Sequence, residues 1–224
     1  CSGCTTIKAI PLIPGLKKLI CMRCTSLKEI PTLPNLEHLD CRECRNLIAI
    51  PELPKLSTLD CSICPSIRSL PPSFPNLKKL VCSQTSVNTL PETPMLETLI
   101  CSVTKIRDIP AMSNLALLEA RHCENLVRLP ELNNLKELDC CGSQSLVSLP
   151  SNVSKLESLH IDRCESIVEF PDMPNLNVFN CSETQIVRIE NMPNLVELDC
   201  TRCCKLVELR NLPSLNKLFC ATCN

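Results

Sequence analysis

One phrase recurs along the whole chain at intervals of 19 to 21 residues, and cysteine takes the same offsets in most copies. The copy at 36–55 reads LEHLDCRECRNLIAIPELPK. A unit of this length cannot bury its apolar side chains alone, but stacked neighbours bury a continuous core. The repetition therefore predicts a single array over residues 1–224. The eleven copies begin at Leu16, Leu36, Leu56, Leu77, Leu96, Leu115, Leu135, Leu156, Leu176, Leu195 and Leu215.

The first half of each copy predicts a short strand. Leu39 and Cys41 alternate with His38, Asp40 and Arg42, which is the period of two expected when one face of a strand is buried. A copy of about 20 residues leaves little room for a helix beside a strand and two turns. We therefore expect about eleven short parallel strands on one face of the array.

The second half of each copy is rich in proline. Pro51 and Pro54 stand three residues apart, and proline inside a helix removes a backbone donor and restricts the preceding residue. The return segment should therefore be extended or polyproline-like, with little or no helix.

The phrase resembles that of the leucine-rich repeat family, L-x-x-L-x-L-x-x-N/C-x-L, over essentially the whole chain. Cysteine usually replaces the third leucine, and Cys, Thr or Ser stands where the family has Asn. Segments such as IPELPK at 50–55 are similar to short repeats of bacterial effectors and of proteins encoded by large DNA viruses, and plant immune receptors share similar phrases. The resemblance implies a leucine-rich repeat solenoid with the strands on its concave face and the extended segments on its convex face.

Most of the twenty cysteines form two columns. Ala120 and Ile161 replace cysteine in the first column, and Thr85 or Ser143 replaces it in the second, so both columns suit small core side chains. The first column contains Cys1, Cys21, Cys41, Cys61, Cys82, Cys101, Cys140, Cys181, Cys200 and Cys220. The second contains Cys4, Cys24, Cys44, Cys64, Cys123, Cys164, Cys203 and Cys223.

Two other interpretations of these cysteines stay open. The spacing of Cys41-x-x-Cys44 and Cys61-x-x-Cys64 is typical of a zinc site, although the substitutions within each column argue against a fixed ligand set. Disulfides between adjacent copies would have a suitable Cα separation but a poor dihedral angle. We expect a core of free thiols without metal or cofactor, which favours a reducing compartment, the cytoplasm or a virion, over secretion through a disulfide-forming route.

Cys141 and Cys204 lie outside both columns. Cys141 should project from the strand face, and Cys204 should follow the turn. Each is either an incidental exposed thiol or a reactive one.

Composition and motifs argue against several classes of function. The net charge is −1, no basic stripe or aromatic platform is present, and no run of about 18 apolar residues or signal peptide is visible, so we expect neither nucleic-acid nor membrane partners. No phosphate loop, nucleophile elbow or zinc-protease motif occurs, and about six copies separate His38 from His160. We expect a protein that is not an enzyme.

The outward side chains of the strands are the remaining candidates for binding a protein partner. The acids could meet a basic partner, and Val81 and Ile100 could form a modest apolar patch, although a solvated sheet face also needs polar residues. The predicted partner-binding residues are Ile20, His38, Asp40, Asp60, Val81, Ile100, Glu119, Asp139, His160, Asn180 and Asp199.

The resemblance to viral and effector repeats suggests two roles. One is a protein-interaction scaffold, as a structural component of a large virus particle or a virus-encoded protein that binds a host protein. The other is the substrate-recognition repeat region of a ubiquitin ligase or effector. Both end copies look like interior ones, so we expect further repeats or neighbouring subunits to contact the ends.

Overall fold

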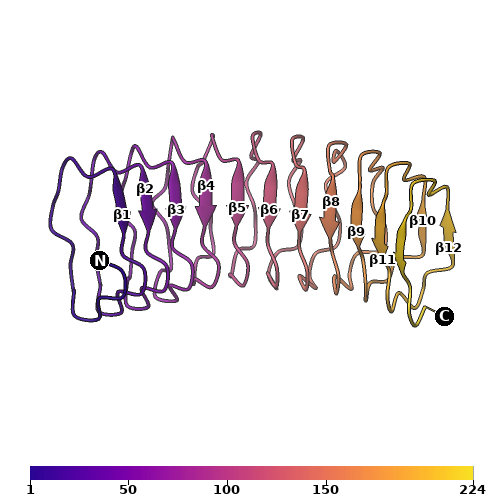
Figure 1. The fold of residues 1–224 in the computed structure, drawn as a ribbon, viewed down its shortest axis with the longest axis horizontal. Helices are drawn as coiled ribbons and strands as arrows, with labels where there is room; N and C mark the ends of the chain where they lie inside the picture. The colour runs from indigo at the N-terminus through magenta and orange to yellow at the C-terminus, as the bar shows by residue number, and fades with distance from the viewer. Residues whose placement is uncertain (224) are drawn as a thin grey trace. The chain divides into compact units, whose positions relative to one another are not determined.

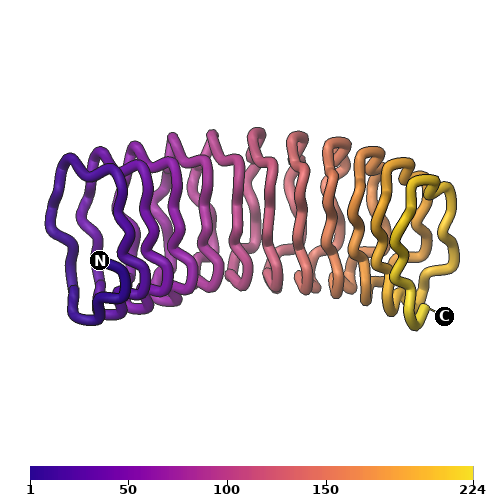
Figure 2. The backbone as a smooth tube through the Cα atoms, in the orientation of Figure 1, coloured from indigo at the N-terminus to yellow at the C-terminus, as the bar shows by residue number. Residues whose placement is uncertain are grey.

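Each repeat makes one coil of a parallel β-solenoid in the computed structural model, which describes residues 1–223 (Figure 2). The coils fall into two units, residues 1–106 and residues 107–224, and each unit is described by itself. No helix occurs among the described residues. The predicted solenoid of short parallel strands is confirmed, and the extent of a single array over 1–224 stays a prediction.

In unit 1, one strand from each of five successive coils forms a parallel ladder in chain order (Figure 1). The central leucines are in register, so Leu39 pairs with Leu19 on one side and with Leu59 on the other. The strands are β1 (Lys18–Ile20), β2 (His38–Asp40), β3 (Thr58–Asp60), β4 (Lys79–Val81) and β5 (Thr98–Ile100).

In unit 2, six strands on the same side of their coils form the order β6-β7-β8-β9-β11-β13. With the five of unit 1 they make eleven strands among the described residues, as the sequence predicted. The six are β6 (Leu117–Glu119), β7 (Glu137–Asp139), β8 (Ser158–His160), β9 (Val178–Asn180), β11 (Glu197–Asp199) and β13 (Lys217–Phe219).

Columns of medium-sized side chains fill the core of each unit. In a typical coil, Leu36, Leu39, Leu47 and Leu53 are at most 2% exposed, and Cys41 is completely buried. From β1 to β9 and in β11, the central strand residue, a leucine or Phe179, is buried, and the two residues that flank it point outward. In these coils one strand residue is fixed in the core and two are displayed on the strand face.

Unit 2 also contains two strands that the sequence analysis did not predict, β10 (Arg188–Glu190) and β12 (Glu208–Arg210), which pair with each other on the return side of their coils. Every earlier coil has proline at the corresponding column, from Pro11 to Pro171. Glu190 and Arg210 replace that proline, and Arg210 supplies the backbone N–H that faces β10 in the ladder. The missing prolines were the available sequence signal.

The turn after each strand uses a left-handed residue directly before the second cysteine column. Its N–H donates to the next coil, as from Arg23 N to Arg42 O at 2.8 Å. Only glycines 3 and 142 relieve the steric cost of this conformation, whereas Ile63 and Val103 adopt φ of 57° despite their branched side chains. The other non-glycine members of this column are Arg23, Glu43, Gln84, His122, Arg163, Glu183, Arg202 and Thr222.

Candidate functional site: the strand face and its thiol core

The first cysteine column lies in the core, except at its two ends. Eight of its ten members are buried. Cys1 and Cys220 are exposed, so their predicted burial is wrong. Each lies in a terminal coil, which has a neighbouring coil on one side only among the described residues.

The second column makes a ladder of thiol hydrogen bonds between coils. The Cys44 thiol donates to the Cys21 carbonyl oxygen at 3.0 Å, and the Cys64 thiol donates to the Cys41 carbonyl oxygen at 3.2 Å. The Ser143 hydroxyl replaces the thiol and donates to the Ala120 carbonyl oxygen at 2.7 Å. The same bond is made by Cys24, Cys164, Cys203 and Cys223.

Threonine closes the same position differently. The Thr85 hydroxyl donates to the Cys82 carbonyl oxygen of its own coil at 2.7 Å, and Thr184 does so with Cys181 at 2.6 Å. Threonine therefore caps its own turn, whereas Cys44, Cys64 and Ser143 reach the preceding coil.

Burial holds most of the core thiols in their neutral form, whereas contact with the Cys21 thiol lowers the pKa of Cys44 and contact with the Cys181 thiol lowers the pKa of Cys203 to about 6. Burial raises the pKa of Cys164 to about 12, and burial also raises the pKa of Cys61 well above its ordinary value, with a further contribution from the Cys82 thiol. No group of three or more His, Cys, Asp or Glu residues within the described chain is placed to hold a metal ion. The thiols of the core can therefore act as hydrogen-bond donors to the backbone.

Cys141 follows strand β7, and its side chain contacts an acid of the next coil. It is partly buried, and its thiol donates to Asp162 Oδ2 at 2.8 Å. Burial and this carboxylate raise the pKa of Cys141 to about 12, which opposes formation of a nucleophilic thiolate. Cys204 is exposed, and its sulfur lies 3.5 Å from the Arg202 carbonyl oxygen.

The middle outward column of unit 1 runs Ile20, Asp40, Asp60, Val81 and Ile100 on adjacent strands. The two acids are bridged by a cation: Arg42 makes a bidentate pair with Asp40 at 3.0 and 2.7 Å, and its Nε lies 3.6 Å from Asp60 Oδ2. His38 flanks this cluster on β2 and is exposed. The cluster, His38 and Ile20 line a shallow groove of about 380 Å³, together with Lys18, Thr58 and Lys79.

Apolar side chains adjoin the charged cluster on both sides. Ile20 is 39% exposed, and Val81 and Ile100 are half-buried neighbours on β4 and β5. Beside that pair, the Ser83 hydroxyl accepts a bond from the Ser102 amide at 3.0 Å. The face of unit 1 therefore combines an ion-pair centre with apolar flanks.

The strand face of unit 2 has a similar arginine between two acids. Arg121 contacts Asp139 at 2.7 Å and lies 3.6 Å from Glu119 Oε1, in a groove of about 180 Å³. His160 follows Asp139 in the column, and its Nε2 lies 3.3 Å from the Ser158 hydroxyl. The arginine partners of both clusters were not predicted, although each stands two residues after an acid in the repeat.

Five of the predicted binding residues also have a structural task that the sequence analysis missed. Each Asp or Asn of the column accepts a bond from the amide two residues later, so one side-chain oxygen closes the turn that follows the strand. The acceptors are Asp40 (3.3 Å), Asp60 (3.1 Å), Asp139 (3.1 Å), Asn180 (3.0 Å) and Asp199 (2.9 Å).

A third groove lies on the return side of unit 2, beside Phe170, and no predicted site residue lines it. The sequence signal is that Phe170 is the one aromatic residue in a column of Ile and Leu.

No protein-family model, curated protein or solved structure matches this chain. The described residues include no helix long and apolar enough to cross a membrane. The description of the site therefore depends on its geometry.

Proposed function

We propose that this protein is a non-catalytic scaffold, built in the manner of leucine-rich repeats, that binds another protein through its strand face. The observation that carries the proposal is the ordered display on unit 1, where the ion-paired cluster of Asp40, Arg42 and Asp60 lies between Ile20 and the Val81–Ile100 pair. Apolar side chains next to oriented charges are typical of the centre of a protein interface.

The chemistry of the column limits what the partner can contact. One oxygen of Asp60 bonds the Ser62 amide and hydroxyl, and Oδ2 faces Arg42 at 3.6 Å. A basic group of a partner would therefore compete with Arg42 for these carboxylates or extend the ion-pair network. A partner with a basic group beside an apolar side chain fits this face.

The biological setting is proposed from the repeat resemblance. We favour a component of a large virus particle or a virus-encoded protein that binds a host protein, in the cytoplasm or the virion. The alternative is the recognition region of a ubiquitin ligase or effector. Finding the chain in the mass spectrum of purified virus particles would favour the first, and a ligase domain in a longer gene product would favour the second.

The test compares affinity capture from an extract of the source cells by the wild-type chain and two variants. Ile100→Lys places a charge in the apolar pair, and Ile48→Lys places the same charge on the return side of unit 1, where Ile48 is 64% exposed. We expect a partner that the wild type and Ile48→Lys retain and that Ile100→Lys loses by at least about tenfold.

A third variant separates charge from structure. Asp60→Asn keeps the oxygen that closes the turn, as Asn180 does naturally, but removes the charge facing Arg42. If the captured partner binds all three variants as well as the wild type, the strand face of unit 1 is not its binding surface.

A further inference from the structure

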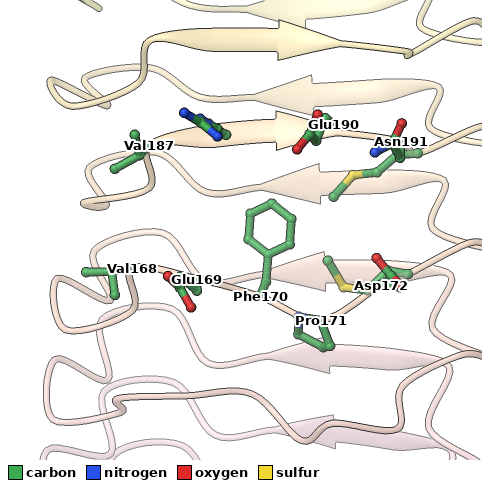
Figure 3. A pocket seen from close by; sticks show the side chains of 11 residues that line it. Val168, Glu169, Phe170, Pro171, Asp172, Val187, Glu190 and Asn191 are labelled. Atoms are coloured by element: carbon green, nitrogen blue, oxygen red, sulfur yellow. The ribbon is translucent and has the colours of Figure 1, made fainter.

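The return side of unit 2 opens between two successive coils. The segment 168–172 and strand β10 border a groove of about 530 Å³ (Figure 3). Figure 3 shows the ring of Phe170 between the two coils, with Glu169 and Asp172 along one border and Val187, Glu190 and Asn191 along the other. The groove lies on the side of the coils away from the strand ladder.

Backbone hydrogen bonds are missing where the groove opens. Some neighbouring return segments bond each other, for example from Ile48 N to Lys28 O at 3.3 Å, from Val147 N to Val127 O at 3.1 Å and from Val207 N to Val187 O at 3.0 Å. Between segments 168–172 and 187–191, both of which the structure describes, no such bond occurs.

Strand β10 therefore has one free edge. In its ladder with β12, Ile189 is paired with Leu209, and the Asn191 amide donates to Arg210 O at 3.2 Å. Because backbone groups of successive strand residues point to opposite edges, the N–H and C=O groups of Arg188 and Glu190 face the groove. A free edge of this kind is a template for another strand.

The floor of the groove is apolar and adaptable. The half-buried Phe170 ring packs edge-on against Phe179, with centroids 5.4 Å apart and planes at 85°. Met173 and Met192 line the groove and are each only 2% exposed. Methionine side chains adjust to different neighbours, so this floor can accept an apolar side chain of varied shape.

The border of the groove is acidic. Glu169, Asp172 and Glu190 form no ion pair or side-chain hydrogen bond within residues 1–223. The one cation of the lining, Arg188, has its Nε 3.8 Å from Glu208 Oε2. Three carboxylates therefore remain to attract a basic residue.

We propose that this groove binds an extended peptide segment of a partner protein, in which basic and apolar residues alternate, as an added strand on the free edge of β10. The peptide backbone bonds Arg188 and Glu190, one apolar side chain enters the Phe170 floor, and its lysine or arginine side chains meet the acidic border. This site lies outside the strand face and does not depend on the function proposed for that face.

The test uses the full chain and a fluorescently labelled, end-capped heptapeptide of alternating valine and lysine. Binding is followed by fluorescence anisotropy. A second peptide with the same side chains has N-methyl groups on alternate amides, which removes the donors that strand addition needs. We expect saturable binding of the first peptide and at least about tenfold weaker binding of the second.

Variants of the protein locate the site. Glu190→Pro removes the edge N–H that faces the groove and restores the residue found in this column from Pro11 to Pro171, so the coil tolerates it. We expect Glu190→Pro to weaken peptide binding at least about tenfold and Glu190→Gln to weaken it by a smaller factor. Glu165→Gln makes the same charge change at an exposed turn outside the groove and should leave binding unchanged.

Three results would overturn the proposal: no binding of the valine–lysine peptide at millimolar concentration, equal binding of the N-methylated peptide, or equal binding by Glu190→Pro. Self-association would also overturn it. If the molecular mass of the protein in solution rises with its concentration, and Glu190→Pro reduces that rise, the occupant of the groove is a second copy of the chain. Ile100→Lys, which alters the strand face, should bind the peptide as well as the wild type does. Failure of the groove proposal can therefore be distinguished from failure of the strand-face proposal.

Discussion

At the scale of single residues, cysteine in the second column acts as a hydrogen-bond donor that tolerates burial. The position needs a small side chain that reaches a carbonyl oxygen in the preceding coil, as Cys44 and Ser143 do. A thiol loses less solvation energy than a hydroxyl when it is buried, so it suits a core that is otherwise leucine. The many cysteines are therefore explained by packing and weak donation.

Replacing Cys44 tests this explanation. Cys44→Val keeps an apolar side chain of similar size but removes the thiol donor to the Cys21 carbonyl oxygen, which keeps its bond from the Cys24 amide, so the cost should be about 0.5–1.5 kcal/mol. Cys44→Ser restores a donor and should cost less. Urea denaturation of both variants under reducing conditions measures the difference, and equal losses would contradict a donor role.

The raised thiol pKa values predict lower stability at alkaline pH. In the unfolded chain Cys164 ionises near its ordinary value of 9.0, whereas in the folded chain its pKa is about 12. The unfolded state therefore binds fewer protons above pH 9, so the stabilisation from the neutral buried thiol is complete below about pH 9 and is lost between about pH 9 and 12. Each pH unit in this window removes up to about 1.4 kcal/mol for such a thiol.

The measurement is the free energy of unfolding in urea at pH 8.5 and pH 10.5, with reductant present. Cys164→Ser removes one ionising group and keeps a donor of the kind that Ser143 provides. We expect this variant to lose less stability over the interval than the wild type. The same loss in both proteins would show that the thiol does not titrate with unfolding.

At the scale of elements, one column decides whether the bonding of neighbouring return segments extends into a strand ladder. Proline at that column has no N–H, so the segment stays unpaired at that point. Arg210 has one, and its coil forms β12 against β10. The groove beside Phe170 lies at the boundary between the two kinds of coil, since Pro171 belongs to the last proline-containing coil and Glu190 to the first without it.

Arg210→Pro should disrupt the ladder between β10 and β12. The change removes the donor that faces β10, so the amides of Ile189 and Asn191 should exchange with solvent at least about tenfold faster. Arg210→Lys keeps the backbone donor and should not change exchange. Amide hydrogen exchange by NMR reads both positions, and unchanged protection in Arg210→Pro would mean that the column does not control pairing.

The repeat period predicted the strands because it fixes which residues are buried, as Leu39 and Cys41 illustrate. It did not predict the partners of the side chains that leave the core. Arg42 can be placed on the strand face from its spacing, but its bidentate contact with Asp40 depends on rotamers that no spacing encodes. The groove at Phe170 likewise lies where two neighbouring return segments form no backbone hydrogen bond. The repeat pattern indicates which residues favour such bonds but not where a bond is absent.

At the scale of the whole molecule, each unit is a stack in which a coil is bonded chiefly to its neighbours. Besides the strands, side-chain ladders join successive coils, as from Asn175 Nδ2 to Ser154 O at 2.7 Å and from Ser166 Oγ to Gln144 O at 2.7 Å. Among the strands of residues 1–223, those in contact within a unit lie in neighbouring coils. Stability should therefore be close to a sum of coil and interface contributions.

Leu159→Ala in β8 tests how far local destabilisation spreads along the coils of unit 2. Leu159 is completely buried between Leu138 and Phe179, so truncation should cost about 2–5 kcal/mol. Because each coil is stabilised by its neighbours, hydrogen exchange should rise most in β7, β8 and β9 and should rise less with each coil further along unit 2. Leu59→Ala, at the equivalent position of β3, is the matched change in unit 1 and should produce the same graded pattern around its own site. Exchange measured by mass spectrometry that rises equally in every coil of the altered unit would instead mean that the unit unfolds as one cooperative body.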